Sequence, residues 1–524
     1  MIQYSQQPTP RLSVPVLTRH WHSQHQPSAM HCLNITLLKQ LMLTMTASLG
    51  YLTIGLIRGW SSTAMPSIKL YSPHLVPSDY VGSWVSAIPP LGAFMGSLLT
   101  GPFLQKFGRK KTMLIAAPIF AVSWVLIGTA VNTAMLIVGR LLTGMCAGII
   151  TPAAQVYVSE CAHPEIRGVL GSLPALFMAT GVLISYIIGT WLPWDHLALV
   201  SAIFPTAMLV FLIPLPESPC WLRSRGRKEE AERSANWLRH QKVVNVELYT
   251  IRNPETNGAE TPTAIAEVDR KQEMTTGSAK SIAKGAYSAE ALLRRPVIIP
   301  FGLVTGVLIF QQVSGIDTVL FYTVEIFNAS GSFVNDYLAT ILVGLVQVLA
   351  TLASLFVIDS YGRKPLLIFS GAFMSVAMAA LGYYFYAHEH GLPIAKSLGL
   401  LPVISLMVFI AAFALGYCNV PFLLMGELLP VAQRSILSSV ASAMNLGSMF
   451  LIIKSYHDLK YWIGDHGVFF SYAVLCIVSC VFVTILLPET KGKSLEEIEC
   501  YFEDKSQKLK EKKVQRKSET SNEQ

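Results

Sequence analysis

The sequence predicts an all-α membrane protein with twelve transmembrane helices in two six-helix repeats. Three observations support this prediction: a hydrophobic composition, twelve separate apolar runs, and short motifs that recur in order in both halves. Hydrophobic residues make up 52% of the 524 residues and charged residues 14%, whereas soluble domains contain about 25% charged residues. A bilayer needs about 20 apolar residues per helix. Runs of this kind are centred near Leu49, Phe94, Val122, Gly148, Thr180, Pro205, Leu308, Leu345, Met374, Phe409, Ala443 and Leu475.

The basic residues predict the orientation of these spans. If both termini are cytoplasmic and the spans alternate, the inner segments hold 34 lysines and arginines and the outer loops hold four, while Arg58 and Arg140 lie within spans. This asymmetry follows the positive-inside rule. The net charge of +8 then faces an anionic inner leaflet, and no nucleic-acid partner is needed to explain it. We expect a plasma-membrane protein, with an internal membrane as the alternative.

The spans divide the chain into five parts. The first 33 residues are rich in Gln, Pro and His and lack the basic-then-apolar pattern of a signal peptide. The linker contains an amphipathic segment, Arg227 to Arg239, with Ala231, Ala235 and Leu238 on one side. We predict a cytoplasmic tail (1–36), a first bundle (37–215), a cytoplasmic linker (216–296), a second bundle (297–487) and a cytoplasmic tail (488–524).

Several classes of site are not supported. The eight cysteines show no metal-ligand spacing, and we expect free thiols rather than a disulfide framework. We find no nucleophile–base pair and no phosphate loop, so we predict no enzyme activity, no metal and no cofactor. Asn328-Ala-Ser330 is a glycosylation triplet placed just outside span seven. Asn34-Ile-Thr36 also matches but lies at the inner face, where it should stay unmodified.

The segment from Gln311 to Asp317 places two amides, a hydroxyl and a carboxylate around Gly315, near the middle of an apolar span. Hydrocarbon offers these groups no partners, and each unpaired group costs roughly 2–7 kcal/mol. Polar groups at this depth usually face a water-filled cavity or a ligand. The segment therefore predicts a binding site, the alternative being amides that only join helices.

Short motifs recur in the same order in the two halves and fall at predicted inner ends of spans. Such parallel repeats of six spans are typical of the major facilitator fold, with its site at the midplane between halves. The recurring pairs are Phe107-Gly-Arg109-Lys with Tyr361-Gly-Arg363-Lys, Glu160 and Arg167 with Glu427 and Arg434, and Pro216-Glu217-Ser with Pro488-Glu489-Thr.

These motifs, together with Gln311-Gln-Val-Ser-Gly-Ile-Asp317, resemble the sugar porter family of the major facilitator superfamily from about Leu49 to Phe502. The segment Arg167 to Gly181 and Ser83-Trp84 are most similar to the insect facilitated trehalose transporters and related animal glucose facilitators. The resemblance implies sugar-contacting roles for Gln311, Gln312, Asp317, Gln347, Phe422 and Asn445.

Several positions depart from the family pattern. Asp317 stands where the family usually has Asn, and Ile57, beside Arg58, stands where proton-coupled sugar porters carry an acid. Ala175, Phe422, Leu446 and Gln105 also replace residues typical of relatives. The departures imply a more open, less glucose-tuned site without the usual proton coupling.

The resemblance implies a facilitative uniporter that works by alternating access and carries trehalose or a hexose such as glucose. We expect it to be a monomer. The alternatives are a sugar sensor that does not transport and a proton-linked sugar symporter. We predict a cytoplasmic gate network in which charged residues of one half meet those of the other, the alternative being that they only anchor the topology. Its members are Arg109, Glu160, Arg167, Glu217, Arg363, Glu427, Arg434 and Glu489.

Two charged residues within the spans leave alternatives open. Arg58 either extends to the outer headgroups or lines the outer vestibule. Asp317 either stays protonated and donates a hydrogen bond as Asn does in relatives, which desolvation favours, or ionises and pairs with Arg58. We favour the protonated form.

Overall fold

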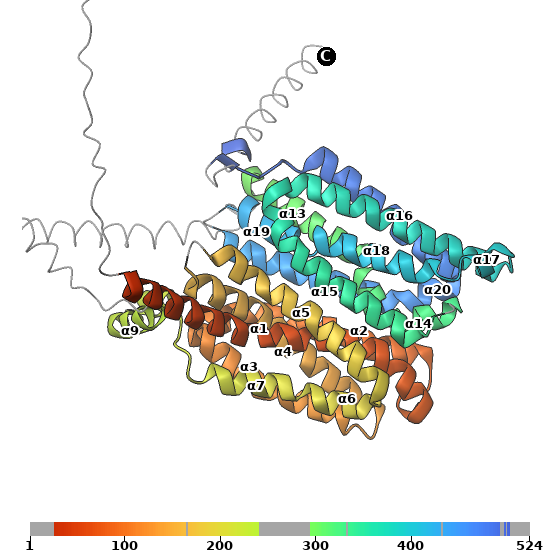
Figure 1. Ribbon diagram of the computed structural model, residues 1–524, viewed down its shortest axis with the longest axis horizontal. Coiled ribbons are helices and arrows are strands. Elements are labelled where there is room, and N and C mark those ends of the chain that lie inside the picture. Colours follow the sequence, from red (N-terminus) through yellow and green to blue (C-terminus); the bar gives the residue numbers. More distant parts are fainter. Residues whose placement is uncertain are drawn as a thin grey trace, which may run out of the picture.

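The chain folds into two helical halves that lie against each other (Figure 1). The computed structural model describes residues 26–163, 166–239, 294–331, 334–430, 433–492, 497, 498 and 500–502. The predicted tail residues 1–25 and 503–524 and linker residues 240–293 lie outside the described residues. We use "inner" for the end that carries α8 and α9, and "outer" for the opposite end, following the orientation that the basic residues predict.

The first half contains the six spans expected from its apolar runs. The last two helices together make one span, Trp194–Leu212. Helix α1 begins ten residues before the predicted end of the tail at residue 36. The elements are α1 (Gln26–Tyr71), η1 (Pro73–Leu75), α2 (Asp79–Phe107), α3 (Arg109–Gly128), α4 (Thr133–Cys161), α5 (Arg167–Trp191), α6 (Trp194–Ser201) and α7 (Ile203–Leu212).

Two spans of the second half are broken into pairs of helices, α13 with α14 and α18 with α19. The elements are α13 (Arg295–Val313), α14 (Ile316–Ser330), α15 (Asp336–Tyr361), α16 (Arg363–Glu389), α17 (Ile394–Ser397), α18 (Leu401–Leu415), α19 (Val420–Leu428) and α20 (Arg434–Leu486).

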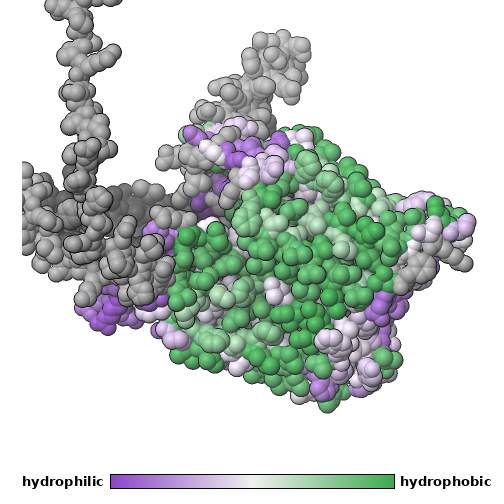
Figure 2. All heavy atoms as spheres, in the orientation of Figure 1, coloured by the Kyte–Doolittle hydropathy of each residue, from purple (hydrophilic) through white to green (hydrophobic). Residues whose placement is uncertain are grey.

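The number of spans fits the prediction of twelve. In the described part of the chain, eleven helical segments are long and apolar enough to cross a membrane. One of them runs over 51 residues, Ile436–Leu486, although a single crossing needs only about 20. Helix α20 leaves helical geometry at Gly464, where φ is 71° and ψ is 170°. It therefore contains spans eleven and twelve. Figure 2 shows the hydrophobic surface between polar ends that such a bundle requires.

Small residues of α2 pack it closely against α4. A Cβ at Gly92 would lie 2.3 Å from the Leu141 oxygen, and one at Gly96 would lie 2.2 Å from the Met145 oxygen. Gly101 is different, since a Cβ there would meet nothing within 4 Å. The close approach of α2 to α4 thus depends on Gly92 and Gly96 and not on Gly101.

The linker begins with α8 (Pro219–Ser224) and α9 (Lys228–Arg239), which adjoin the inner end of the first half. Ala231 and Leu238 are buried and Ala235 is half-buried, as the amphipathic pattern predicts. The Ser234 hydroxyl donates to the Glu217 carbonyl over 2.6 Å, and the Lys39 ammonium lies 5.2 Å above the Trp237 ring. These contacts fasten α9 to the first half.

The two halves meet along an outer seam. The Ser62 hydroxyl accepts a hydrogen bond from the Val324 backbone N–H over 3.1 Å. The Tyr186 hydroxyl lies 2.9 Å from the Leu320 carbonyl, to which it donates. Buried residues of the first half, including Ala87 and Tyr186, belong to the hydrophobic core of the second half. These contacts lie in the outer halves of their spans, so the outer side is closed.

The topology predicts where a glycan attaches. Asn328 is exposed in the last turn of α14, at the outer end, and its amide donates to Asp336 over 3.3 Å. We expect enzymatic deglycosylation to shift the gel mobility of the natural chain and of Asn34→Gln, but not of Asn328→Gln. A shift that Asn34→Gln abolishes and Asn328→Gln retains would mean that the orientation is inverted.

Candidate functional site

A break at Gly315 divides span seven and presents its polar residues. Gly315 has φ 86° and ψ 10°, a left-handed conformation that side chains other than glycine rarely adopt. A Cβ there would also lie 2.5 Å from Cδ2 of Tyr472. Gln311 and Gln312 occupy the end of α13, and Asp317 begins α14. The break therefore places an amide pair and a carboxylate on either side of one turn.

Asn445 of α20 joins the two glutamines into a buried amide cluster. Its Nδ2 donates to the Gln311 Oε1 over 3.0 Å and to the Leu308 carbonyl over 2.8 Å. Its Oδ1 accepts from the Gln312 Nε2 over 3.2 Å. The Gln311 Nε2 donates to the Tyr417 carbonyl over 2.7 Å. The structure thus brings together three of the six predicted substrate-contacting residues.

Two buried amide oxygens, one in this cluster and one on α15, have no described partner. The Oε1 atoms of Gln312 and Gln347 are buried and accept no hydrogen bond from the described residues. Such an oxygen costs about 1–3 kcal/mol when left unpaired, so both are suited to accept a hydrogen bond from a ligand hydroxyl. Phe422, on α19, is 44% exposed. Its ring is accessible, but it does not form part of the amide cluster.

Asp317 pairs with Arg58 across the two halves. The Arg58 Nε lies 3.3 Å from the Asp317 Oδ1, and the side chains are 16% and 2% exposed. Arginine keeps its proton in proteins, so its buried charge favours an ionised partner. The structure thus shows the contact with Arg58 that the ionised alternative requires. Arg58 does not extend to the headgroups, because its guanidinium contacts the Asp317 carboxylate inside the protein.

The sequence reasoning missed Arg140. This α4 residue is completely buried, and no ion pair among the described residues includes it. It donates to the carbonyls of Val85 and Ile57, both over 3.3 Å, and to the Ser61 hydroxyl. Its guanidinium lies 4.7 Å from the centre of the Trp60 ring. A lone arginine in an apolar run signals a buried polar network, but the sequence does not reveal that carbonyls and a ring satisfy it.

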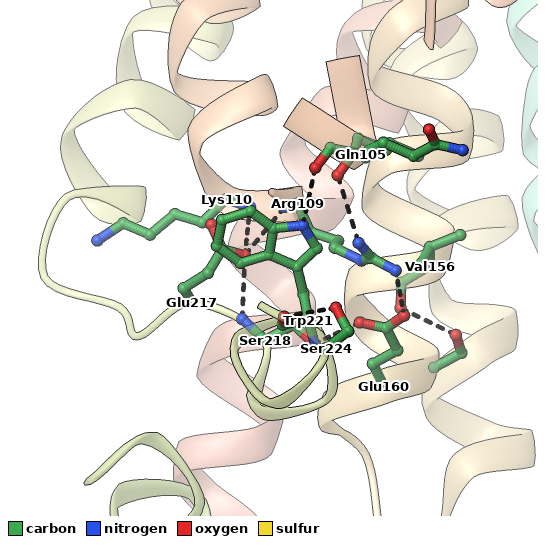
Figure 3. A network of polar contacts seen from close by, with 11 residues as sticks. Gln105, Arg109, Lys110, Val156, Glu160, Glu217, Ser218, Trp221 and Ser224 are labelled. Carbon is green, nitrogen blue, oxygen red and sulfur yellow. Dashed lines mark hydrogen bonds and ion pairs between the residues drawn. The ribbon is translucent and has the colours of Figure 1, made fainter. Parts of the chain in front are cut away.

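Three first-half members of the predicted gate network, Arg109, Glu160 and Glu217, form one compact cluster (Figure 3). The Arg109 Nη2 lies 2.7 Å from the Glu160 Oε1, and the second Glu160 oxygen accepts from the Ser218 hydroxyl. The Glu217 carboxylate accepts from the backbone N–H groups of Arg109 and Lys110, both over 3.0 Å. Glu217 therefore caps the N-terminus of α3, where the helix dipole favours negative charge.

The second half builds the same cluster from its own repeat. Arg363 contacts Glu427 at 3.0 Å, and Glu427 accepts from the Thr490 hydroxyl over 2.6 Å. Glu489 accepts from the N–H groups of Arg363 and Lys364 and caps α16. Burial opposes ionisation of Glu489, but the N–H groups of Lys491, Arg363, Lys364 and Thr490 outweigh it and hold the pKa of the carboxyl below its ordinary value.

The contacts described here for the gate network lie within each half. The predicted approach of the two clusters belongs to the state in which the inner side is closed, and it stays a prediction. The Arg434 guanidinium donates to the Leu429 carbonyl of its own half over 3.0 Å. Arg167 begins α5, but its side chain lies outside the described residues.

A family model described as "Sugar (and other) transporter" matches residues 42–502. The chain belongs to the sugar transporter family. Among its relatives is a facilitated trehalose transporter of Anopheles gambiae, 37% identical over 462 residues that make up 88% of this chain and 55% of the relative. A facilitated trehalose transporter of Culex quinquefasciatus is 36% identical over 462 residues, 88% of this chain and 85% of the relative. The chain thus spans about half the length of the Anopheles relative.

The fold of this sugar transporter family member also matches solved structures. A proton:xylose symporter of the major facilitator superfamily superposes with a TM-score of 0.67 at 24% identity, over 88% of this chain and 99% of the symporter. The predicted major facilitator fold with two six-helix repeats is therefore confirmed, and the family is one of transporters rather than enzymes.

The Glu489 cap predicts a pH-dependent contribution to stability. We expect Glu489→Gln to lower the free energy of unfolding by about 1 kcal/mol at neutral pH, because a charged cap at a helix N-terminus is lost. Since the folded pKa lies below the ordinary 4.5, the contribution is complete above 4.5 and disappears as the pH falls through the lowered value.

Thermal unfolding of purified protein over a pH series measures this difference. Glu230→Gln, in the exposed Arg227–Glu230 pair of α9, is the control and should change little. A Glu489→Gln difference of equal size at every pH would exclude the proposed contribution of the charge.

Proposed function

We propose that this chain is a facilitative sugar transporter, a uniporter that works by alternating access and carries trehalose or a hexose such as glucose. The observation that carries the proposal is the buried amide cluster of Gln311, Gln312 and Asn445 at the break in span seven, with unpaired oxygens on Gln312 and Gln347. Asp317, five residues after Gln312, pairs with Arg58 of the other half, and the closed seam continues on the outer side of this pair. Relatives described as facilitated trehalose transporters support the same activity.

The chemistry of the site suits a neutral polyol. A side-chain amide offers both donors and acceptors, which matches sugar hydroxyls that both donate and accept. The accessible Phe422 ring offers an apolar face for sugar C–H groups. Together with Asp317, these residues are the substrate-contacting set that we propose: Gln311, Gln312, Asp317, Gln347, Phe422 and Asn445.

The surroundings of Arg140 favour uniport over proton-linked transport. The position at which proton-coupled relatives carry an acid is Ile57, and its backbone carbonyl accepts from Arg140. A carbonyl cannot take up and release a proton in this pH range, so the pair carries no proton through the cycle. Asp317 is held by the Arg58 charge, which opposes its protonation.

The inner clusters are the proposed gate network. Arg109, Glu160 and Glu217 stabilise the inner end of one half, and Arg363, Glu427 and Glu489 repeat this in the other. We propose that the two clusters, with Arg167 and Arg434, approach each other when the inner side closes. Charge pairs with access to water contribute about 0–1 kcal/mol each, so they adjust the balance of states without deciding the fold.

The proposed setting is the plasma membrane, with both termini cytoplasmic, the basic linker and tail facing anionic lipid, a glycan on Asn328, and a monomer as the working unit. An internal membrane is the alternative location.

Uptake into proteoliposomes tests the function. We expect labelled trehalose, glucose or fructose to enter until internal and external concentrations are equal, and an imposed proton gradient to leave the final level unchanged. Accumulation above equality under a proton gradient would identify a symporter. Binding of a sugar without flux would identify a sensor.

The amide cluster predicts a loss of affinity in Asn445→Ala. This change leaves Gln311, Gln312 and the Leu308 carbonyl without a shared partner, and each unpaired group costs about 1–3 kcal/mol. We therefore expect the half-saturation concentration for uptake to rise by about 10- to 100-fold. Ser448→Ala on the same helix, whose hydroxyl donates to the Met444 carbonyl, is the matched control. An equal effect of both changes would mean that the cluster does not contact substrate.

A further inference from the structure

Arg58 and Asp317 form a buried ion pair that crosses from one half to the other. Arg58 lies on α1 and Asp317 at the start of α14, with 3.3 Å between Nε and Oδ1. The other ion pairs described above, such as Arg109–Glu160 and Arg363–Glu427, each lie within one half. A contact across the halves must change when the halves rock, whereas a contact within one half can persist.

The pair is costly to separate while the site is dry. Removing two charges from water costs several kcal/mol per ion, and their mutual attraction offsets this only while they stay together. The Asp317 side chain is 2% exposed, so a lone carboxylate there would have little solvent. Separation of α1 from α14 therefore requires water or a ligand to take the place of each partner.

The pair lies on the inner side of other contacts of the outer seam. Further out along the same two helices, the Ser62 hydroxyl accepts from the Val324 N–H. Between α2 and α20, the Lys454 ammonium lies 5.4 Å from the centre of the Trp84 ring. On its inner side Asp317 follows Gln312 by five residues across the Gly315 break. The pair thus stands between the candidate sugar site and the closed outer side.

The contact leaves capacity for a ligand. The Arg58 Nε and the Asp317 Oδ1 touch without an aligned hydrogen bond, and both atoms are buried without another hydrogen-bond partner among the described residues. A donor and an acceptor side by side match a sugar hydroxyl, which accepts from the first and donates to the second.

We propose that Arg58 is a positioning residue of the transport cycle: through its ion pair with Asp317 it holds α14 against α1 and keeps the outer side closed until hydroxyls or water replace the contact. This inference rests on the proposed alternating-access function. It predicts that loss of either charge shifts the resting protein toward the outward-open state, without any sugar present.

The accessibility of a cysteine at Ala87 measures this shift. Ala87 is completely buried in the core shared by the two halves near the seam, so Ala87→Cys should react with a membrane-impermeant thiol reagent only when the seam opens. We expect Arg58→Gln and Asp317→Asn each to raise the labelling rate from the outside by roughly tenfold or more. Labelling of the natural cysteines is subtracted using the same chain without Ala87→Cys.

The double variant Arg58→Gln/Asp317→Asn keeps the test valid even where a single variant folds poorly, because it leaves no lone charge. We expect its labelling rate to rise by about as much as in one single variant, since both changes break one contact. Asp465→Asn, which removes the Lys460–Asp465 pair within the second half, should leave the rate unchanged.

Unchanged labelling in the double variant, a double effect equal to the product of the two single effects, or an equal effect of Asp465→Asn would overturn the inference. Labelling is measured without sugar, so its result does not depend on flux. A raised labelling rate without any sugar uptake would support the role of the Arg58–Asp317 pair and reject the proposed function. Sugar uptake without a raised labelling rate would support the function and reject the role of the pair.

Discussion

Hydrocarbon provides no hydrogen-bonding partner, and this constraint determines how the helices of this protein meet. Polar groups within the spans are matched by groups from other spans: Arg140 of α4 by carbonyls of α1 and α2, and the span-seven glutamines by Asn445 of α20. Each match fixes the depth and rotation of two helices at once. The side-chain oxygens of Gln312 and Gln347 have no hydrogen-bond partner among the described residues. By the same constraint, a bound ligand is a suitable donor for them.

The repeated inner clusters show how the constraint is met at the membrane surface. In both halves an arginine pairs with a glutamate, and that glutamate accepts from a Ser or Thr hydroxyl. A second glutamate caps the helix that begins at the same arginine. In the first half the pattern joins the start of α3, the end of α4 and the segment after α7. It therefore stabilises each half as a unit, and the motion that transport requires takes place between the halves.

The sequence was enough to predict the spans, the repeat and the amide segment, because each depends on residue type and order alone. The break at Gly315 was not predicted, because a glycine among polar residues does not by itself reveal a left-handed turn. Nor was the sequence enough to predict which charges meet. Arg109 with Glu160 and Arg58 with Asp317 differ only in whether the partners belong to one half. Which charged residues pair depends on how each helix is rotated and on how the two halves are placed. The pattern of apolar residues determines neither. Arg140 was missed for the same reason, since its partners are backbone carbonyls.

The two kinds of ion pair have different consequences for the conformational cycle. Partly exposed pairs at the inner end contribute about 0–1 kcal/mol in contact with water, whether the seam is open or closed. The Arg58–Asp317 pair is buried while the seam is closed and meets water once it opens. Water entry then weakens the attraction that resisted opening and solvates both charges. The conformation with a closed, dry seam and the conformation with an open, hydrated seam are therefore both favoured. Partly hydrated conformations between them have a higher free energy. A single buried pair placed across the halves in this way converts a gradual rocking motion into a switch between two states.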